Sequence, residues 1–327
     1  RRRTLSRAPP TEERKANYWQ WLWLGTFALS LRFLARDTHG GGGNVVNLAL
    51  CLLAFDAAER DRPRAAGLWL GLSLATKPTQ LWLLPVFLLF GKTRAVGWTV
   101  VTGLVAALLT LALQRFDITP WQRWIEGSWR LATQGDAFAV PTLDFPPFIW
   151  MNQSLRCAIA RWGGDVPPDL AARVIMGVPP GLGLSPMVLG WLTRVVSLGL
   201  LGWLLTTAWR TRSTPTSRLW VFAGALVVSV LLSPLSWKAH HMALVPMLFL
   251  LLQRAVRERR RGHWCVLAAW AVCCLPGKEL IGNAADEWGN SVYVVTVWDV
   301  VLFAIAMRAA RVRGSTDAAP ANTPTRA

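Results

Sequence analysis

The sequence predicts an all-α protein that crosses a membrane several times. Of its 327 residues, 53% are hydrophobic and 16% are charged, whereas about a quarter of the residues in a soluble domain are charged. Several apolar runs approach the roughly 20 residues that a membrane helix needs, with clear examples at 95–113, 187–209 and 291–307. The 20 Trp against two Tyr fit this class, because indole rings favour the membrane interface.

A basic segment, residues 1–16, precedes the first group of apolar runs, which covers residues 17–113. The helices predicted there have approximate bounds of 17–36, 44–57, 66–76, 79–90 and 94–113. The two short runs 66–76 and 79–90 read as one element that is broken at Lys77-Pro78, because proline lacks the N–H that a helix interior needs.

Residues 114–186 form a segment rich in Trp and Pro between the two groups of membrane helices. Its tryptophans near residues 121–129 favour an amphipathic helix along the interface, and its proline pairs indicate ordered loops. The second group of membrane helices covers residues 187–310, with bounds near 187–209, 217–234, 239–253, 263–276 and 291–308. We therefore expect about ten transmembrane or re-entrant helices, followed by a disordered tail over 311–327.

The basic clusters predict the orientation. If residues 1–16 are cytoplasmic, alternation of these helices places every dense basic cluster on the same side, as the positive-inside rule requires; these clusters lie at 60–64, 92–94, 210–212, 257–261 and 308–313. We expect a multi-pass protein of the plasma or inner membrane with both ends of the chain in the cytoplasm. The net charge of +17 then reflects topology and contact with anionic lipids. Nucleic acid is excluded as a partner, because no binding motif accompanies the charge.

A second group of polar residues falls on the opposite face. It contains the 36–44 stretch, Lys77, the 114–186 segment, the 238–241 stretch and the loop at 277–288. These pieces share one compartment outside the cytoplasm, which favours an enzyme that works on the extracytoplasmic face.

The junction 233–241, Ser-Pro-Leu-Ser-Trp-Lys-Ala-His-His, is the main candidate site. It places Trp237, Lys238, His240 and His241 between two apolar runs, where ionisable groups usually line a cavity, pair or act on a substrate. The histidines suit proton transfer or a hydrogen bond to a phosphate leaving group. The alternative without a catalytic role is a histidine pair at the membrane interface that contacts water. We predict no metal, because adjacent histidines point to different faces and no acidic ligand lies near in sequence.

Five more residues are candidate substrate ligands. Lys77 suits a phosphate, and the alternative is a lysine that snorkels at a helix end. Asn44 follows four glycines that let backbone approach a ligand, although it also suits a helix N-cap. Asp144 lies in a Pro-bounded loop, and Asn152 and Gln153 suit sugar hydroxyls or a helix start.

Four motifs occur in an order that resembles a known family: His39-Gly-Gly-Gly-Gly-Asn44, Ala75-Thr-Lys-Pro-Thr79, Asn152-Gln-Ser-Leu155 and the 233–241 junction. Over most of residues 17–310 the chain resembles the polyprenyl-phosphate-mannose-dependent mannosyltransferases of glycosyltransferase family 87. The resemblance implies the GT-C fold, an extracytoplasmic active site and inverting transfer from a lipid-phosphate sugar. It also implies a general-base Asp in the first extracytoplasmic loop, which we expect upstream of Arg1 together with two missing helices.

The sequence therefore predicts a membrane glycosyltransferase. It would move a hexose, with mannose the first choice, from a polyprenyl-phosphate donor to a hydroxyl of a glycolipid or glycan acceptor. The donor is a co-substrate, and we expect no cofactor. The alternatives are a flippase or transporter of lipid-linked sugars and a non-catalytic partner in envelope assembly. The sugar, acceptor and linkage stay open.

Overall fold

The computed structural model describes residues 12–41, 43–133, 138 and 150–316, and Asp144 lies outside them. Within these ranges the chain is helical and has no strand. The elements, in chain order, are α1 (Glu12–His39), α2 (Asn44–Glu59), α3 (Pro63–Thr76), η1 (Pro78–Trp82), α4 (Leu83–Leu89), α5 (Thr93–Leu113), α6 (Thr119–Thr133), α7 (Leu155–Gly163), α8 (Pro168–Ala171), α9 (Pro186–Thr211), α10 (Pro215–Leu232), η2 (Lys238–Leu244), α11 (Val245–Glu258), α12 (Arg261–Cys274), α13 (Lys278–Ser291) and α14 (Val294–Thr316).

Membrane-spanning length is the first test of the predicted class. In the described part of the chain, four helical stretches are long and apolar enough to cross a membrane: α5, α9, α10 and the continuous stretch of η2 and α11. Two bent pairs, α1 with α2 and α12 with α13, raise the number to six if each pair counts as one span. The all-helical membrane class is confirmed, while the expected total of about ten membrane or re-entrant helices stays a prediction.

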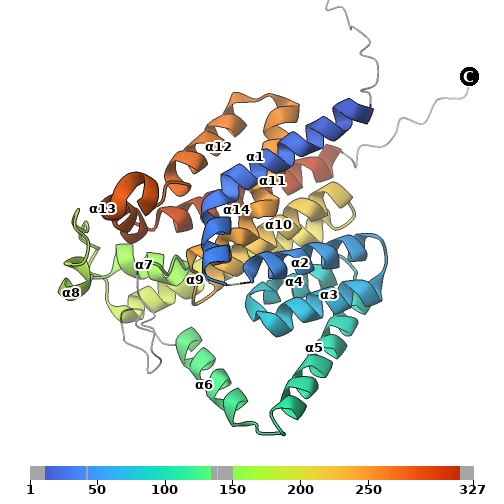
Figure 1. Ribbon diagram of the computed structural model, residues 1–327, viewed down its shortest axis with the longest axis horizontal. Coiled ribbons are helices and arrows are strands. Elements are labelled where there is room, and N and C mark those ends of the chain that lie inside the picture. Colours follow the sequence, from blue (N-terminus) through green and yellow to red (C-terminus); the bar gives the residue numbers. More distant parts are fainter. Residues whose placement is uncertain (1–11, 42, 134–137, 139–149, 317–327) are drawn as a thin grey trace, which may run out of the picture.

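Helix α10 forms the centre of the bundle. Its side chains from Trp220 to Leu231 are buried almost without interruption, and it packs against α9, α11, α14 and η1. Phe222 of α10 stacks on Phe55 of α2 with ring centroids 4.4 Å apart. Helix α5, by contrast, is apolar and has few buried residues, as expected for a helix that faces lipid over much of its surface. Figure 1 shows α5 and α6 as two arms of a V, with the first part of α5 beside α3.

Helices α2, α3 and α10 each run between a basic end and a polar end of the bundle. At the basic end, Arg218 of α10 pairs with Glu59 of α2 at 2.6 Å. Since α2 has 16 residues, its other end, which begins at Asn44, lies about 24 Å away. The basic clusters and the second group of polar residues, which the sequence predicts on opposite faces, therefore also lie at opposite ends of these helices.

Several local predictions are confirmed and others need correction. Helix α3 ends at Thr76 and η1 begins at Pro78, so the chain breaks at Lys77 as predicted. Helix α6 occupies the stretch expected to be amphipathic. Helix α13 lies where we expected a loop, with a kink at Gly282. Helix α14 continues to Thr316, so helix replaces the first part of the tail expected over 311–327; residues 317–327 lie outside the described residues.

Close approach of α3 to α5 depends on two glycines one helical turn apart. A Cβ atom at Gly67 would lie 2.3 Å from the Cβ of Trp98 and 2.7 Å from the carbonyl oxygen of Ala95. A Cβ atom at Gly71 would lie 2.5 Å from the Cβ of Thr102. Such small-residue faces let membrane helices pack backbone to backbone.

We expect Gly67→Ala to destabilise the protein by about 1–3 kcal/mol, because the added methyl group forces α3 away from α5. Gly103→Ala on α5 is the matched control, since a Cβ there meets nothing within 4 Å. The control should be neutral or stabilising, because alanine is the better helix former by about 0.5–1 kcal/mol. Thermal unfolding in detergent compares them, and equal melting temperatures would contradict the close packing.

Candidate active site

The junction between α10 and η2 is held by a single asparagine. Proline at 234 cannot continue α10, and Trp237 has extended backbone before η2 begins. The Nδ2 of Asn152 donates to the carbonyl of Pro234 at 3.0 Å, and its Oδ1 accepts from the N–H of Ser236 at 2.9 Å. Asn152 is fully buried, so one amide satisfies two of the backbone polar groups of this turn.

Gln153 extends this arrangement to the C-terminal helices. Its backbone N–H donates to the carbonyl of Ser236 at 2.7 Å. Its Nε2 donates to the carbonyls of Trp150 and Asn290 at 2.8 and 3.0 Å. Asn152 and Gln153 are both fully buried and position the junction, and their role as ligands of substrate stays a prediction.

The reversal between α1 and α2 creates a second polar cluster. Gly41 and Gly43 have φ values of 59° and 60°, in the left-handed region that favours glycine. The reversal brings the buried Asp37 against the start of α2, where its carboxylate accepts from the Asn44 Nδ2 at 2.6 Å and from the Val45 N–H at 2.9 Å. A carboxylate at a helix N-terminus satisfies free N–H groups and matches the helix dipole.

Asn44 connects this carboxylate to Lys77. The Nζ of Lys77 donates to the Asn44 Oδ1 at 2.5 Å, so the amide bridges an anion and a cation. Burial lowers the pKa of the Lys77 ammonium, and the nearby Asp37 carboxylate opposes that shift. The structure thus brings together Asn44 and Lys77, which are far apart in sequence but were both predicted as site residues.

His240 lies beside this cluster, within electrostatic range of Lys77 and Asp37. Its Nδ1 accepts the backbone N–H of Trp237 at 3.1 Å. A neutral imidazole that accepts at one nitrogen carries its proton on the other, so the Nε2 of His240 is a hydrogen-bond donor. In this arrangement His240 can stabilise an anion but cannot accept a proton at Nε2. Trp237 itself is half-buried, and its backbone holds the histidine ring.

His241 occupies a different environment from its neighbour. Its side chain and that of Asp299 are both fully buried, with His241 Nε2 2.9 Å from Asp299 Oδ2. Its Nδ1 lies 3.1 Å from the carbonyl of Trp237, and its ring stacks on Phe33. The two adjacent histidines therefore separate into one that faces the polar cluster and one that joins η2 to α14 in the core.

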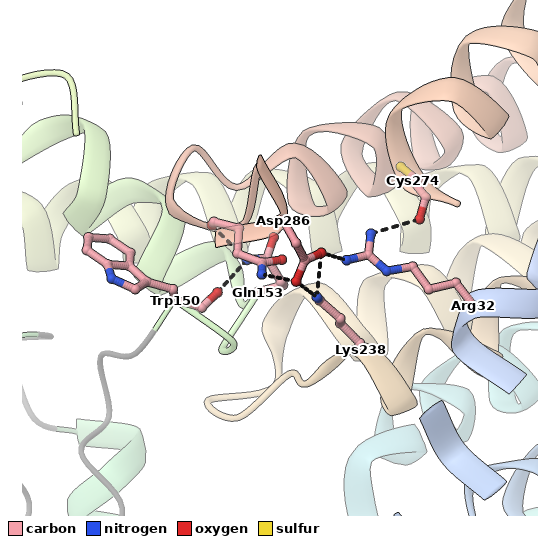
Figure 2. Close-up of polar contacts among 7 residues, drawn as sticks. Arg32, Trp150, Gln153, Lys238, Cys274 and Asp286 are labelled. Carbon is pink, nitrogen blue, oxygen red and sulfur yellow. Dashed lines mark hydrogen bonds and ion pairs between the residues drawn. The ribbon is translucent and has the colours of Figure 1, made fainter. Parts of the chain in front are cut away.

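Lys238 belongs to a network of charges that joins three helices. Figure 2 shows the Asp286 carboxylate between Lys238 and Arg32. The Nδ2 of Asn290 also donates to Asp286 Oδ2, at 3.2 Å. The Lys238 Nζ lies 3.1 Å from Asp286 Oδ2, and Arg32 pairs with Oδ1 of the same residue. Arg32 also donates to the carbonyl of Cys274 at 3.1 Å. One carboxylate thus serves two cations, and the Lys238 ammonium is already paired.

Three partners in these networks were not predicted: Asp37 as the acceptor for Asn44, Asp286 as the partner of Lys238, and Asp299 as the partner of His241. Asp299 did carry a signal, because it is a lone acid in an apolar stretch and such residues commonly pair or act on a substrate. Sequence spacing alone did not indicate which residue each of these three carboxylates would contact. Among the described residues, no group of three His, Cys, Asp or Glu side chains is placed to hold a metal.

Comparison with known proteins gives two matches. The family model described as Glycosyltransferase family 87 matches residues 2–234, a range that contains Asn44, Lys77 and Asn152. A polyprenol-phosphate-mannose-dependent alpha-(1-2)-phosphatidylinositol mannoside mannosyltransferase of Mycolicibacterium smegmatis is 26% identical over 273 residues. That region is 77% of this chain and 55% of the relative, so the chain spans about half the length of the curated relative that it matches. No solved structure matches the chain.

We expect Asp37→Asn to lower the free energy of unfolding by about 1–3 kcal/mol, because an amide NH2 would then face N–H donors that the carboxylate now satisfies. Asp56→Asn is the control, since Asp56 makes an exposed pair with Arg60 one turn away that is worth about 0.3–0.5 kcal/mol. Thermal unfolding of both variants measures the difference. Equal losses would contradict the assignment of Asp37 as the anchor of α2.

Proposed function

The chain belongs to glycosyltransferase family 87, and on that premise we propose that it is a membrane mannosyltransferase with a polyprenyl-phosphate-mannose donor. The matched relative uses a donor of this kind, as its name states. The acceptor hydroxyl belongs to a glycolipid or glycan. We place the reaction on the extracytoplasmic face of the membrane. The polar cluster of Asp37 and Asn44 lies at one end of α2, and the ion pair of Glu59 and Arg218 marks the opposite, basic end.

The observation that carries this proposal is the convergence of Lys77 and His240. Each arises from a break between helices, and the charge of Lys77 is near enough to act on the His240 imidazole. Lysine is a common phosphate ligand, and a neutral imidazole N–H can donate to the same group. Together they suit the phosphate of a lipid-linked sugar, which gains negative charge as it leaves.

The reaction is a single displacement at the anomeric carbon. The acceptor oxygen forms the new bond to C1 while the bond from C1 to the phosphate oxygen breaks, and the phosphate leaves with the electron pair. One displacement inverts the configuration at C1. The proton of the acceptor hydroxyl passes to a general base. Lys77 and His240 stabilise the charge that develops on the leaving phosphate, which is commonly a large contribution to catalysis.

The geometry assigns lesser roles to the other predicted residues. Lys238 is paired with Asp286, so it contributes to the field of the site and fixes the start of η2. Asn44 holds the Lys77 ammonium in place. His241 acts on the site through its contact with the Trp237 carbonyl and is a positioning residue.

We expect Lys77→Met to reduce mannosyl transfer roughly 100-fold, which is the scale of losing one charged donor to a developing anion. Lys92→Met is the control, because Lys92 also lies between two helices but pairs with Asp61 near the basic end. The measurement is transfer of label from radioactive polyprenyl-phosphate-mannose in membranes that contain the full-length protein. Equal activity of the two variants would contradict a phosphate role for Lys77.

Substitution of the two histidines should have different effects on turnover and on melting temperature. We expect His240→Ala to lower turnover at least tenfold with little change in melting temperature, because its side chain is half-buried at the site. His241→Ala should lower the melting temperature by several degrees, because it leaves the buried Asp299 without its partner. The reverse pattern would show that His241 and not His240 serves the reaction.

A further inference from the structure

Helix α13 contributes no side chain to the main hydrophobic core. The residues that it buries are Asn290 and Ser291, both at its C-terminal end. Its large apolar side chains are exposed, among them Leu280, Ile281 and Trp288. An element with so little buried apolar surface has a low local stability, and it can open while the core stays folded. Polar contacts and not packing therefore hold α13 in place.

The C-terminal end of α13 is fixed to the segment around α7. The carbonyl of Asn290 accepts from the Nε2 of Gln153 at 3.0 Å. The carbonyl of Ser291 accepts from the Nε of Arg161 at 2.8 Å, and Arg161 is fully buried. Hydrogen bonds from a charged donor are among the stronger ones in proteins. Figure 1 shows α13 at the same end of the molecule as α7 and α8.

The N-terminal part of α13 can bend at a glycine. Helices α12 and α13 meet at an angle of 86°, and Gly282 then interrupts α13 with φ 78° and ψ 163°. This backbone conformation is almost restricted to glycine. A Cβ atom at Gly282 would meet nothing within 4 Å, so the backbone conformation and not packing requires glycine there. Gly282 therefore has the properties of a hinge.

One carboxylate connects α13 to the elements that carry the site. Within the described part of the chain, the ion pairs of α13 are those of Asp286 with Lys238 and Arg32 (Figure 2). Lys238 begins η2, two residues before His240. Arg32 lies on α1, five residues before Asp37. Asp286 thus joins α13 to both α1 and η2, between the break in α13 and its fixed end.

We propose that α13 is a lid on the site and that the Asp286 carboxylate is its latch. With the latch closed, α13 lies against η2 and α1 as in this structure. With the latch open, α13 bends at Gly282 and lets substrate enter and product leave. This inference rests on the proposed function, because a lid on a glycosyl donor serves to exclude water from the reacting carbon.

Exclusion of water matters because water competes with the acceptor for the donor. The oxygen of water would form the new bond to C1 while the bond from C1 to the phosphate oxygen breaks. The phosphate would leave with the electron pair, and the water proton would pass to the general base. The products are free mannose and polyprenyl phosphate. A loss of folded enzyme lowers release and transfer of mannose alike, so the ratio of released to transferred mannose reports on the lid.

Two substitutions should open the lid by different means. Asp286→Asn removes the charge of the latch, and Gly282→Ala strains the backbone of the closed form. Both controls lie on the same helix. Glu287→Gln changes the next carboxylate, which takes no part in the latch. Gly289→Ala adds a Cβ that meets nothing within 4 Å at a glycine without a positive φ.

Hydrogen exchange by mass spectrometry measures opening of α13 in the purified full-length protein. Label from radioactive polyprenyl-phosphate-mannose gives the ratio of released to transferred mannose in the same preparations. Melting temperatures verify that each variant is folded. Exchange in the buried helix α10 serves as the internal reference, and Asp286→Glu restores the charge of the latch.

We expect Asp286→Asn and Gly282→Ala to speed amide exchange in α13 roughly tenfold, with α10 unchanged, and to raise the ratio of released to transferred mannose several-fold. Both controls should match the wild type, and Asp286→Glu should lie nearer to it than Asp286→Asn. Unchanged exchange in Asp286→Asn would overturn the latch. Faster exchange with an unchanged ratio would overturn the lid. Absence of any mannosyl transfer by the wild type would count against the proposed function, and the exchange data would still decide whether Asp286 holds α13.

Discussion

The turn from Pro234 to Ser236 is the feature on which the site depends. It interrupts helices in the middle of an apolar bundle, where every free N–H and carbonyl must find a partner within the protein. Asn152 provides both partners with one side chain, donating to Pro234 and accepting from Ser236. This arrangement fixes where η2 begins, and it thereby sets the directions in which Lys238, His240 and His241 project from the same short helix.

Each of these three side chains then receives a distinct electrostatic environment. Lys238 shares the Asp286 carboxylate with Arg32, so its charge is balanced close to the junction. His241 pairs with Asp299 in the core. Removal of either residue would leave the other buried without a polar partner. His240 instead lies within electrostatic range of Lys77 and Asp37. Lys238 and His241 thus pair with carboxylates, whereas His240 bonds to the backbone of its own junction.

The sequence predicted the broken helices and the residues at the breaks, because proline and local charge act over short distances. Lys77, Asn44 and His240 were all identified in this way, and the structure brings them together. The partners could not be predicted, since the pairs Lys238 with Asp286 and His241 with Asp299 join residues whose spacing carries no periodicity. Asn152 was assigned to substrate because its amide suits a sugar hydroxyl, and only the fold shows that backbone groups use it. Residues 277–288 were expected to form a loop, and the structure shows helix α13 there.

The central claim is that Lys77 and His240 bind the phosphate of the lipid-linked sugar. The most direct test is a solid-state NMR measurement of dipolar coupling between ³¹P of bound polyprenyl phosphate and ¹⁵N-labelled lysine and histidine side chains in the full-length protein. We predict one lysine and one histidine within direct contact of the phosphorus, with the lysine signal lost in Lys77→Met and the histidine signal lost in His240→Ala. Couplings that persist unchanged in both variants would contradict the account.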